Sequence, residues 1–227
     1  MANKYWVGAG ASFNSIYWSL TSGGSSGAGV PDSLDTALYD RSSGSCAVDA
    51  STTLGNLTLC SDYTATITYT YPIFTNSLSL AGGLLTTSDR SIHVYGDVSC
   101  IAGFGNYSPT NNAIIAMEGS WPQTVVTLGG ILPHLVINND STFEVSVAGT
   151  GDLFFNGDLV INDGTFNSSG HNLALLGTPS NLYQPPSSFN VDFTWGIMPS
   201  FNVDFTWGVV PIVSADFSWD QIFVTPE

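Results

Sequence analysis

Three aspartates around residue 158 are the residues of this chain best placed for acid–base chemistry. A glycosidase uses two carboxyl groups ~5–9.5 Å apart, and Asp152 together with Asp158 or Asp163 offers such a pair. Each aspartate, however, belongs to a Gly-Asp or Asp-Gly step, and such steps are typical of turns. We therefore interpret them as corner residues and predict no catalytic residues, which leaves a polysaccharide hydrolase as the third functional hypothesis.

The histidines and cysteines indicate neither a metal site nor a catalytic triad. The histidines lack HxH or HExxH spacing and have no evident triad partners in the sequence; they are His93, His134 and His171. The cysteines form no CxxC pair, and we expect buried free thiols, with a disulfide between the first two as the alternative; they are Cys46, Cys60 and Cys100. We predict no cofactor and no metal.

The net charge of the chain limits the kinds of molecule that it is expected to bind. The chain contains 18 acidic residues and only three basic ones, Lys4, Arg41 and Arg90, which gives a formal net charge of -15. Nucleic-acid binding requires clustered lysine and arginine, and anionic membranes attract the same residues, so we expect neither partner. A polysaccharide lyase also needs a cationic group to neutralise the substrate carboxylate. The chain is therefore predicted not to be an enzyme of that kind.

The sequence contains no targeting or spanning segment of the usual kinds. No apolar run approaches the ~18–20 residues that a membrane span requires, and no apolar region follows Lys4 as it would in a signal peptide. We expect the protein to stay where it is made until a particle is released, or its signal to lie outside this sequence.

The elements that would position any site are short strands. From residue 45 to 178, runs of three to six β-forming residues alternate with Gly, Asn and Asp, without a helical period, and this pattern predicts an all-β domain. Very short strands with Leu or β-branched residues inward and Asn or Gly at the corners favour a β-solenoid, or β-helix, over 45–178. A β-sandwich or jelly roll is the alternative.

The segment 1–44 is rich in aromatic residues and glycine, and we interpret it as an N-terminal cap. The run Ser22–Gly29 must form a loop, and no strand-loop-helix context makes it a phosphate-binding site. The large rings of Trp6, Tyr17 and Trp18 are expected to shield the first layer of strands.

The same segment resembles an N-terminal sequence signature of a known group of proteins. The phrases Tyr5–Gly10, Tyr17–Ser19, Val30–Asp35 and Leu38–Asp40 together resemble an N-terminal signature of predicted β-helical proteins in tailed-phage virions and in some bacterial surface proteins. Gly-Asp-Leu and Gly-Thr-Phe phrases further along resemble the same proteins, so the likeness spans roughly residues 4–178. It implies a structural role in a virion or on a surface, and it brings no catalytic residues.

The C-terminal part departs from that resemblance. Residues 179–187 read as a proline-rich linker, and 188–227 contain one strand three times with a period of twelve: Ser188–Gly196, its identical copy Ser200–Gly208, and the looser Ser214–Asp220. In each copy the apolar residues alternate with polar ones and so share one face of a strand ~23 Å long. These apolar residues are Phe189, Val191, Phe193, Trp195, Phe201, Val203, Phe205, Trp207, Phe217 and Trp219.

We predict that this repeated tail is an assembly arm, because a three-stranded sheet with one aromatic face cannot bury that face by itself. Three alternatives remain open. The tail packs on its own chain as extra strands, its rings stack on sugars, or Asp192, Asp204 and Asp216 form a cation ladder, although one Asp per strand supplies few of the six to eight oxygens that Ca²⁺ takes.

Together these observations predict a non-enzymatic phage virion structural protein, a capsid decoration (cement) or head-fibre component. We expect a homotrimer that contacts other virion proteins such as the major capsid protein and that is assembled into the virion in the host cytoplasm. The alternative is a tail-fibre or surface adhesin that binds host glycan.

Overall fold

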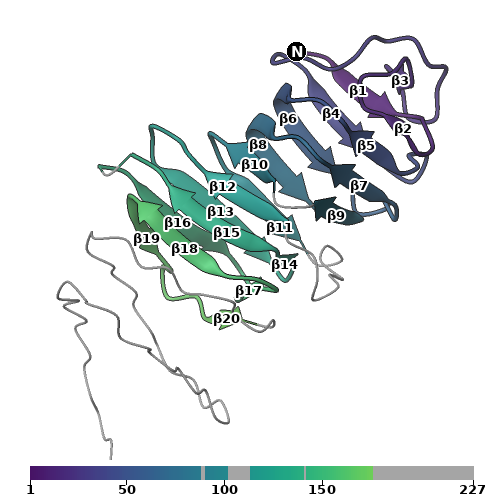
Figure 1. Cartoon of the computed structure of the whole chain (residues 1–227). Helices are drawn as coiled ribbons and strands as arrows, with labels where there is room; N and C mark the ends of the chain where they lie inside the picture. Colours follow the sequence, from purple (N-terminus) through teal and green to yellow (C-terminus); the bar gives the residue numbers. More distant parts are fainter. Residues whose placement is uncertain (88–89, 102–112, 141, 176–227) are drawn as a thin grey trace, which may run out of the picture.

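The computed structural model describes residues 1–87, 90–101, 113–140 and 142–175. These residues form an all-β coil of about six turns and contain no helix, and no described segment is a helix able to cross a membrane. Figure 1 shows the strands stacked side by side from β1 at the N-terminal end to β19 and β20 at the other. The prediction of a β-solenoid is confirmed, and the sandwich alternative is wrong because the strands of successive turns pair in parallel.

The main sheet has thirteen strands and begins in the N-terminal segment. Its first five strands are β1 (Asn3–Trp6), β3 (Trp18–Ser19), β4 (Thr36–Tyr39), β6 (Thr52–Leu59) and β8 (Ile73–Leu80). All pair in parallel except β1 with β3. The segment 1–44 therefore contributes strands to the sheet on which the rest of the coil is built.

The main sheet forks at β8. The first half of β8 pairs with β10 and the second half with β11, so each later turn has two strands in place of the single long strand of β6 and of β8. The first face of the later turns consists of β10 (Ser91–Val94), β12 (Ile114–Met117), β15 (His134–Asn138) and β18 (Leu159–Asp163). The second face consists of β11 (Val98–Ile101), β13 (Gln123–Leu128), β16 (Glu144–Gly149) and β19 (Thr165–Asn167).

Two smaller sheets close the coil. The earlier turns are closed by β2 (Ala11–Ser12), β5 (Cys46–Val48), β7 (Thr66–Tyr69) and β9 (Leu84–Thr87). The later turns are closed by β14 (Ile131–Leu132), β17 (Leu153–Phe155) and β20 (Leu173–Leu175). All described pairs in these two sheets are parallel.

The core lies inside the coil as stacks of similar side chains. One stack consists of residues that pair in register from turn to turn and are at most 2% exposed: Leu57, Leu78, Val98, Val125 and Val147. The alternation of strand residues places every second side chain inward, and burying each such side chain stabilises the fold by ~1.5–3 kcal/mol. The coil is therefore held together along its whole described length.

Two strands are longer than the predicted three to six residues. β6 and β8 each contain eight residues, because polar residues that resemble turn formers lie within them and point outward. Ser77 donates a hydrogen bond to Asn56 Oδ1 at 2.6 Å, and Asn56 Nδ2 donates to Thr36 Oγ1 at 3.2 Å. This polar row joins three neighbouring strands on the outside of the sheet.

Candidate functional site

The ten residues predicted to form the assembly arm lie in 188–227, outside the described residues, as does the linker 179–187. What the structure describes is the turn from which this part of the chain departs. In that turn β18, β19 and β20 each pair with one described strand, which is β15, β16 and β17 respectively. The outer edges of these strands carry backbone N–H and C=O groups that no described strand pairs, and such edges are templates for a further strand.

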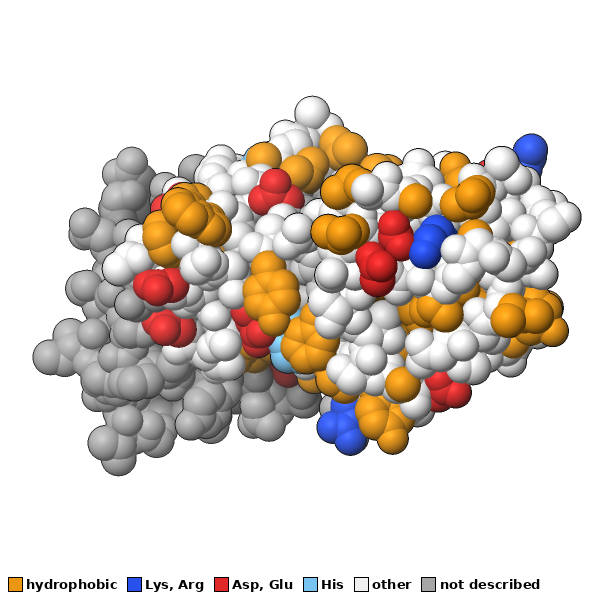
Figure 2. Space-filling view, turned by 90° about the horizontal axis from the view of Figure 1, so that it is seen from above, with side chains coloured by type: hydrophobic (Ala, Val, Ile, Leu, Met, Phe, Trp, Pro, Cys, Tyr) orange, Lys and Arg blue, Asp and Glu red, His pale blue; other side chains and the backbone are white. Residues whose placement is uncertain are grey.

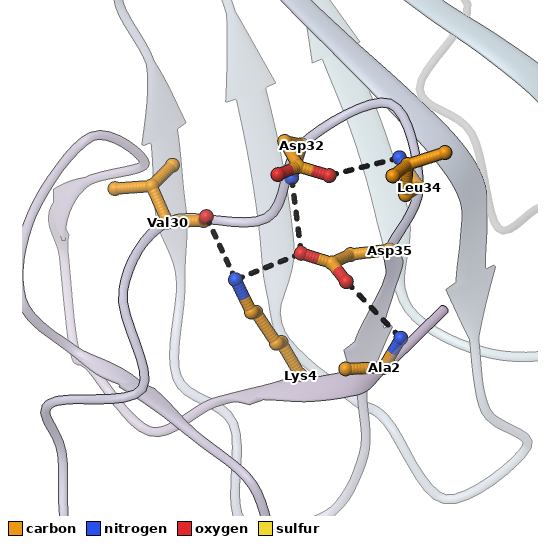
Figure 3. A network of polar contacts seen from close by, with 6 residues as sticks. All are labelled: Ala2, Lys4, Val30, Asp32, Leu34 and Asp35. Carbon is orange, nitrogen blue, oxygen red and sulfur yellow. Dashed lines mark hydrogen bonds and ion pairs between the residues drawn. The ribbon is translucent and has the colours of Figure 1, made fainter.

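The opposite end of the coil is fastened by polar contacts (Figure 3). Lys4 Nζ lies 2.8 Å from Asp35 Oδ2 and donates a hydrogen bond to the Val30 carbonyl at 3.0 Å. The Ala2 amide donates to Asp35 Oδ1 at 3.1 Å, and the Asp32 amide lies 3.4 Å from Oδ2. The two charged side chains are only 13% and 10% exposed. We call this group the N-terminal lock, because it ties the first strand to the loop that precedes β4.

The lock changes the acidity of its carboxyl group. The hydrogen bond from Lys4 is the largest influence, and together with the backbone donors Ala2 and Asp32 it lowers the pKa of Asp35 below the ordinary value of 3.8 despite the opposing effect of burial. The ionised form is therefore the form that the fold stabilises.

Aromatic rings fill the core beside the lock. Trp6, Phe13, Trp18, Tyr39 and Tyr63 are at most 1% exposed. The Trp18 ring makes edge contacts with Phe13 at 4.9 Å, Trp6 at 5.2 Å and Tyr39 at 5.7 Å between centroids. Its indole nitrogen donates to the Phe13 carbonyl at 2.8 Å, so the buried polar group is satisfied. We call these five rings the aromatic cap.

The three cysteines are free thiols, and no disulfide joins them. Cys46 and Cys100 are buried as expected, whereas Cys60 is only partly buried. Burial is the main cause that raises the pKa of Cys46 and of Cys100 to about 12. Since the thiolate is the reactive form, these two thiols behave as packing groups.

The aspartates considered for acid–base chemistry lie at three different corners of the last turns. Asp152 precedes β17, Asp158 precedes β18, and Asp163 ends β18. Asp158 and Asp163 are five strand residues apart, which corresponds to ~16 Å, and Asp152 Oδ1 accepts a hydrogen bond from Asn172 at 3.1 Å. Each of the three carboxyl groups thus occupies a corner position, as the Gly-Asp and Asp-Gly steps predict.

Two of the histidines contact residues of neighbouring turns, and the sequence gives no sign of these partners. His93 Nδ1 lies 2.8 Å from Glu118 Oε2, and its ring stacks on Phe74 at 4.7 Å with an interplanar angle of 18°. His134 Nδ1 accepts a hydrogen bond from the Asp158 amide at 3.0 Å. A coil brings residues of successive turns side by side, and the number of residues per turn varies, so such partners have no fixed spacing in the sequence.

Three consecutive turns place an aromatic residue at the corner between the first and second faces. Tyr95 follows β10, Trp121 lies between β12 and β13, and Phe143 lies between β15 and β16. Tyr95 is 43% and Trp121 71% exposed, and the half-buried Phe143 ring lies 6.2 Å from that of Trp121, with 33° between the planes. We call these three residues the aromatic edge. In the view of Figure 2, hydrophobic side chains stand out in separate groups beside acidic ones and a histidine.

A buried amide holds the loop that carries Trp121. Gln123 is 1% exposed; its Nε2 donates to the carbonyls of Val94 at 3.1 Å and Gly96 at 2.5 Å, and its Oε1 accepts from the Gly119 amide at 2.9 Å. The side-chain nitrogen and oxygen of Gln123 thus both form hydrogen bonds with backbone groups of two neighbouring corners. The loop around Trp121 is therefore fixed to the preceding turn.

The aromatic edge was missed in the sequence interpretation. A signal for it exists, since Trp121 stands directly before Pro122 between two β-forming runs, where a turn is expected and where a large ring has no inward position. Phe143 has no comparable signal, because it adjoins a strand whose inward positions also carry apolar residues.

Among residues 1–87, 90–101, 113–140 and 142–175, no group of three or more His, Cys, Asp or Glu side chains is arranged to hold a metal ion. The comparisons of the chain with protein-family models, with curated proteins and with solved structures find no match. The function must therefore be inferred from the residues and the fold.

Proposed function

We propose that this chain is a non-enzymatic structural protein of a bacteriophage virion, a capsid decoration or head-fibre component that is assembled in the host cytoplasm. The observation that carries the proposal is the contrast between the two ends of the coil. The N-terminal end is closed by the lock and the aromatic cap, whereas the last described turn is followed in the sequence by three repeats that are predicted to be amphipathic. This is the organisation of a rigid element with one attachment end.

The resemblance of the N-terminal signature supports the proposal. Its residues have structural roles in this chain: Trp6 and Trp18 belong to the aromatic cap, and Asp32 and Asp35 belong to the N-terminal lock. A signature that builds the end of a coil is consistent with a shared structural element and requires no shared chemistry.

The composition supports it as well. Only three lysine and arginine residues occur in 227, so a trypsin-like protease finds few cleavage sites. A continuous parallel coil with stacked apolar residues suits a particle that persists outside a cell. The partners we propose are further copies of the chain, as a homotrimer, and other virion proteins such as the major capsid protein.

The attachment role belongs to the tail. The sequence of each repeat predicts a strand with Phe, Val, Phe and Trp, or part of this set, on one face, and burial of these side chains would be sufficient for a strong interface. The outer edges of β18, β19 and β20, which no strand of the described residues pairs, lie at the end of the coil that precedes the tail in the sequence. They offer backbone groups to strands of the same or of a second copy.

Removal of residues 188–227 tests the proposal. The shortened chain is expected to keep the β-rich circular dichroism spectrum and cooperative unfolding of the coil, but to sediment as a monomer and to fail to bind particles. A full-length control carries the changes Asn190→Ser and Asn202→Ser on the polar face of the repeats and is expected to assemble normally. A shortened chain with the oligomeric state and particle binding of the full chain would contradict the proposal.

A further inference from the structure

The aromatic edge is exposed although the fold has the means to bury such rings. Trp6 and Trp18 are fully buried, whereas Trp121 is 71% exposed. An exposed indole leaves a large apolar surface in water, and rings of this kind, held at a protein surface, are the residues that most often dominate binding energy. The position of Trp121 is therefore more informative than that of a scattered surface leucine.

The edge is held rigidly from both sides. Gln123 fastens the Trp121 loop to the preceding turn. From the following turn, the fully buried Asn139 donates from Nδ2 to the Trp121 carbonyl at 3.2 Å, while its Oδ1 accepts from the Asp140 amide at 3.0 Å. Two buried amides thus support a loop whose ring points into solvent, and a preorganised contact surface loses little entropy on binding.

Two carboxylates belong to the same corner loops as the rings. Glu118, 24% exposed, begins the same corner loop as Trp121 and is oriented by His93 at 2.8 Å. Asp140 is exposed at the next corner, where its Oδ1 accepts hydrogen bonds from the Thr142 amide at 3.1 Å and the Thr142 hydroxyl at 2.9 Å. Carboxylates accept several hydrogen bonds at once, so hydroxyl groups of a ligand above the rings would find acceptors on this corner.

We propose that the aromatic edge binds an oligosaccharide without acidic groups. Sugar rings present apolar C–H faces that stack on Trp121 and Phe143, and their hydroxyl groups donate to Glu118 and Asp140. Successive turns of a parallel coil are ~4.8 Å apart, and the Trp121 and Phe143 rings lie side by side at successive corners. An extended glycan chain would lie along this line of corners, to which Tyr95 of the preceding turn also belongs. This function is separate from the tail and from assembly.

The charges define the class of sugar. Lys4 is engaged with Asp35, Arg41 lies in the N-terminal turns, and Arg90 precedes β10, at the end of that strand away from Tyr95. The edge itself carries carboxylates and the chain has a net charge of -15, so uronic and sialic acids are repelled. Neutral and amino sugars are accepted.

Titration of the full-length protein with four hexasaccharides tests the proposal, with tryptophan fluorescence and saturation-transfer NMR as readouts. The probes are maltohexaose and chitohexaose, which are neutral, the cationic glucosamine hexamer, and the anionic galacturonate hexamer. We expect saturable binding of at least one neutral or cationic probe and none of the anionic one. Absence of binding for all four, or preference for the anionic probe, would overturn the proposal.

Matched variants locate the site. Trp121→Ala and Phe143→Ala are each expected to weaken binding at least tenfold, whereas Leu128→Ala, which removes a 40% exposed side chain from another corner, leaves binding unchanged. Unaltered unfolding midpoints exclude a general loss of structure. Equal sugar binding by the wild type and both edge variants would overturn the proposal. It would also be overturned if the wild type bound no sugar and Trp121→Ala dissociated the oligomer, because the ring would then be a contact between protein chains.

Discussion

The N-terminal end of the coil and the corner between its first two faces use the same residue types in opposite ways. In the aromatic cap, Trp18 is enclosed by other rings, and its indole nitrogen is bonded within the protein. On the aromatic edge, Trp121 is mostly exposed, and the buried side chains of Gln123 and Asn139 donate or accept hydrogen bonds that hold its loop. Burial of the first tryptophan stabilises the fold, whereas we propose that the exposure of the second serves contact with a ligand.

The residues that stabilise the fold and the residues proposed to bind a ligand therefore lie in different parts of the chain. It predicts that substitutions in the aromatic cap and the N-terminal lock change the free energy of unfolding, while substitutions on the aromatic edge change binding. Four substitutions test the separation, and their expected effects on stability decrease in the order given.

Trp18→Ala is expected to have the largest effect. It removes a fully buried ring that contacts three others, and large-to-small changes of this kind cost ~3–5 kcal/mol. Urea unfolding followed by circular dichroism measures the loss. A loss below ~1 kcal/mol would mean that the cap does not contribute to the stability of the coil.

Gln123→Leu is expected to destabilise the fold by ~2–3 kcal/mol, because the Gly96 carbonyl and the Gly119 amide lose their side-chain partner. The Val94 carbonyl also loses the Gln123 hydrogen bond but keeps the one from the Glu118 amide. Faster hydrogen exchange at residues 119–122 should accompany the loss, since the loop is no longer tied to the preceding turn. Thr124→Ser, at the exposed side of the same strand start, serves as the control. Unchanged exchange in Gln123→Leu would contradict the role of this amide in holding the edge.

Asp35→Asn is expected to cost ~1 kcal/mol at pH 7, within the range of partly exposed ion pairs. Because the pKa of Asp35 is lowered in the folded protein, its contribution is present above the ordinary value of 3.8 and is lost as the pH falls through the lowered pKa. The difference between wild type and variant should therefore shrink on acidification below pH 3.8. Asp62→Asn, an exposed turn residue, should show no such difference at any pH, and a constant difference for Asp35→Asn would contradict the account of the lock.

Trp121→Ala is expected to have the smallest effect, within ~0.5 kcal/mol, as for other surface substitutions. The ring is mostly in solvent, and the hydrogen bond to Asn139 uses the backbone carbonyl, which the variant keeps. Thermal unfolding of the variant beside Trp18→Ala makes the contrast between the two tryptophans direct. A large loss in Trp121→Ala would show that the ring supports the fold and would remove the distinction.

The sequence predicts the kind of fold because the coil repeats a local pattern. Inward residues such as Leu57, Leu78 and Val98 alternate with Ser and Thr, and this alternation is visible without knowledge of any long-range contact. The fork at β8 was not predictable, since nothing local distinguishes Asn76, within a strand, from Asn138, at a strand end. The proposed sites also differ in how far the sequence predicts them. The repeats in 188–227 are evident from the sequence, whereas the pairing of His93 with Glu118 depends on the register of turns whose length varies.

The most direct test of the central proposal is a cryo-EM map of phage particles purified from the cells in which this chain is produced. The proposal predicts the described coil as a rod at fixed positions and fixed copy number on the particle, with the end that carries β18, β19 and β20 towards the particle and the N-terminal lock away from it. Absence of the protein from purified particles, or attachment through the N-terminal end, would contradict it.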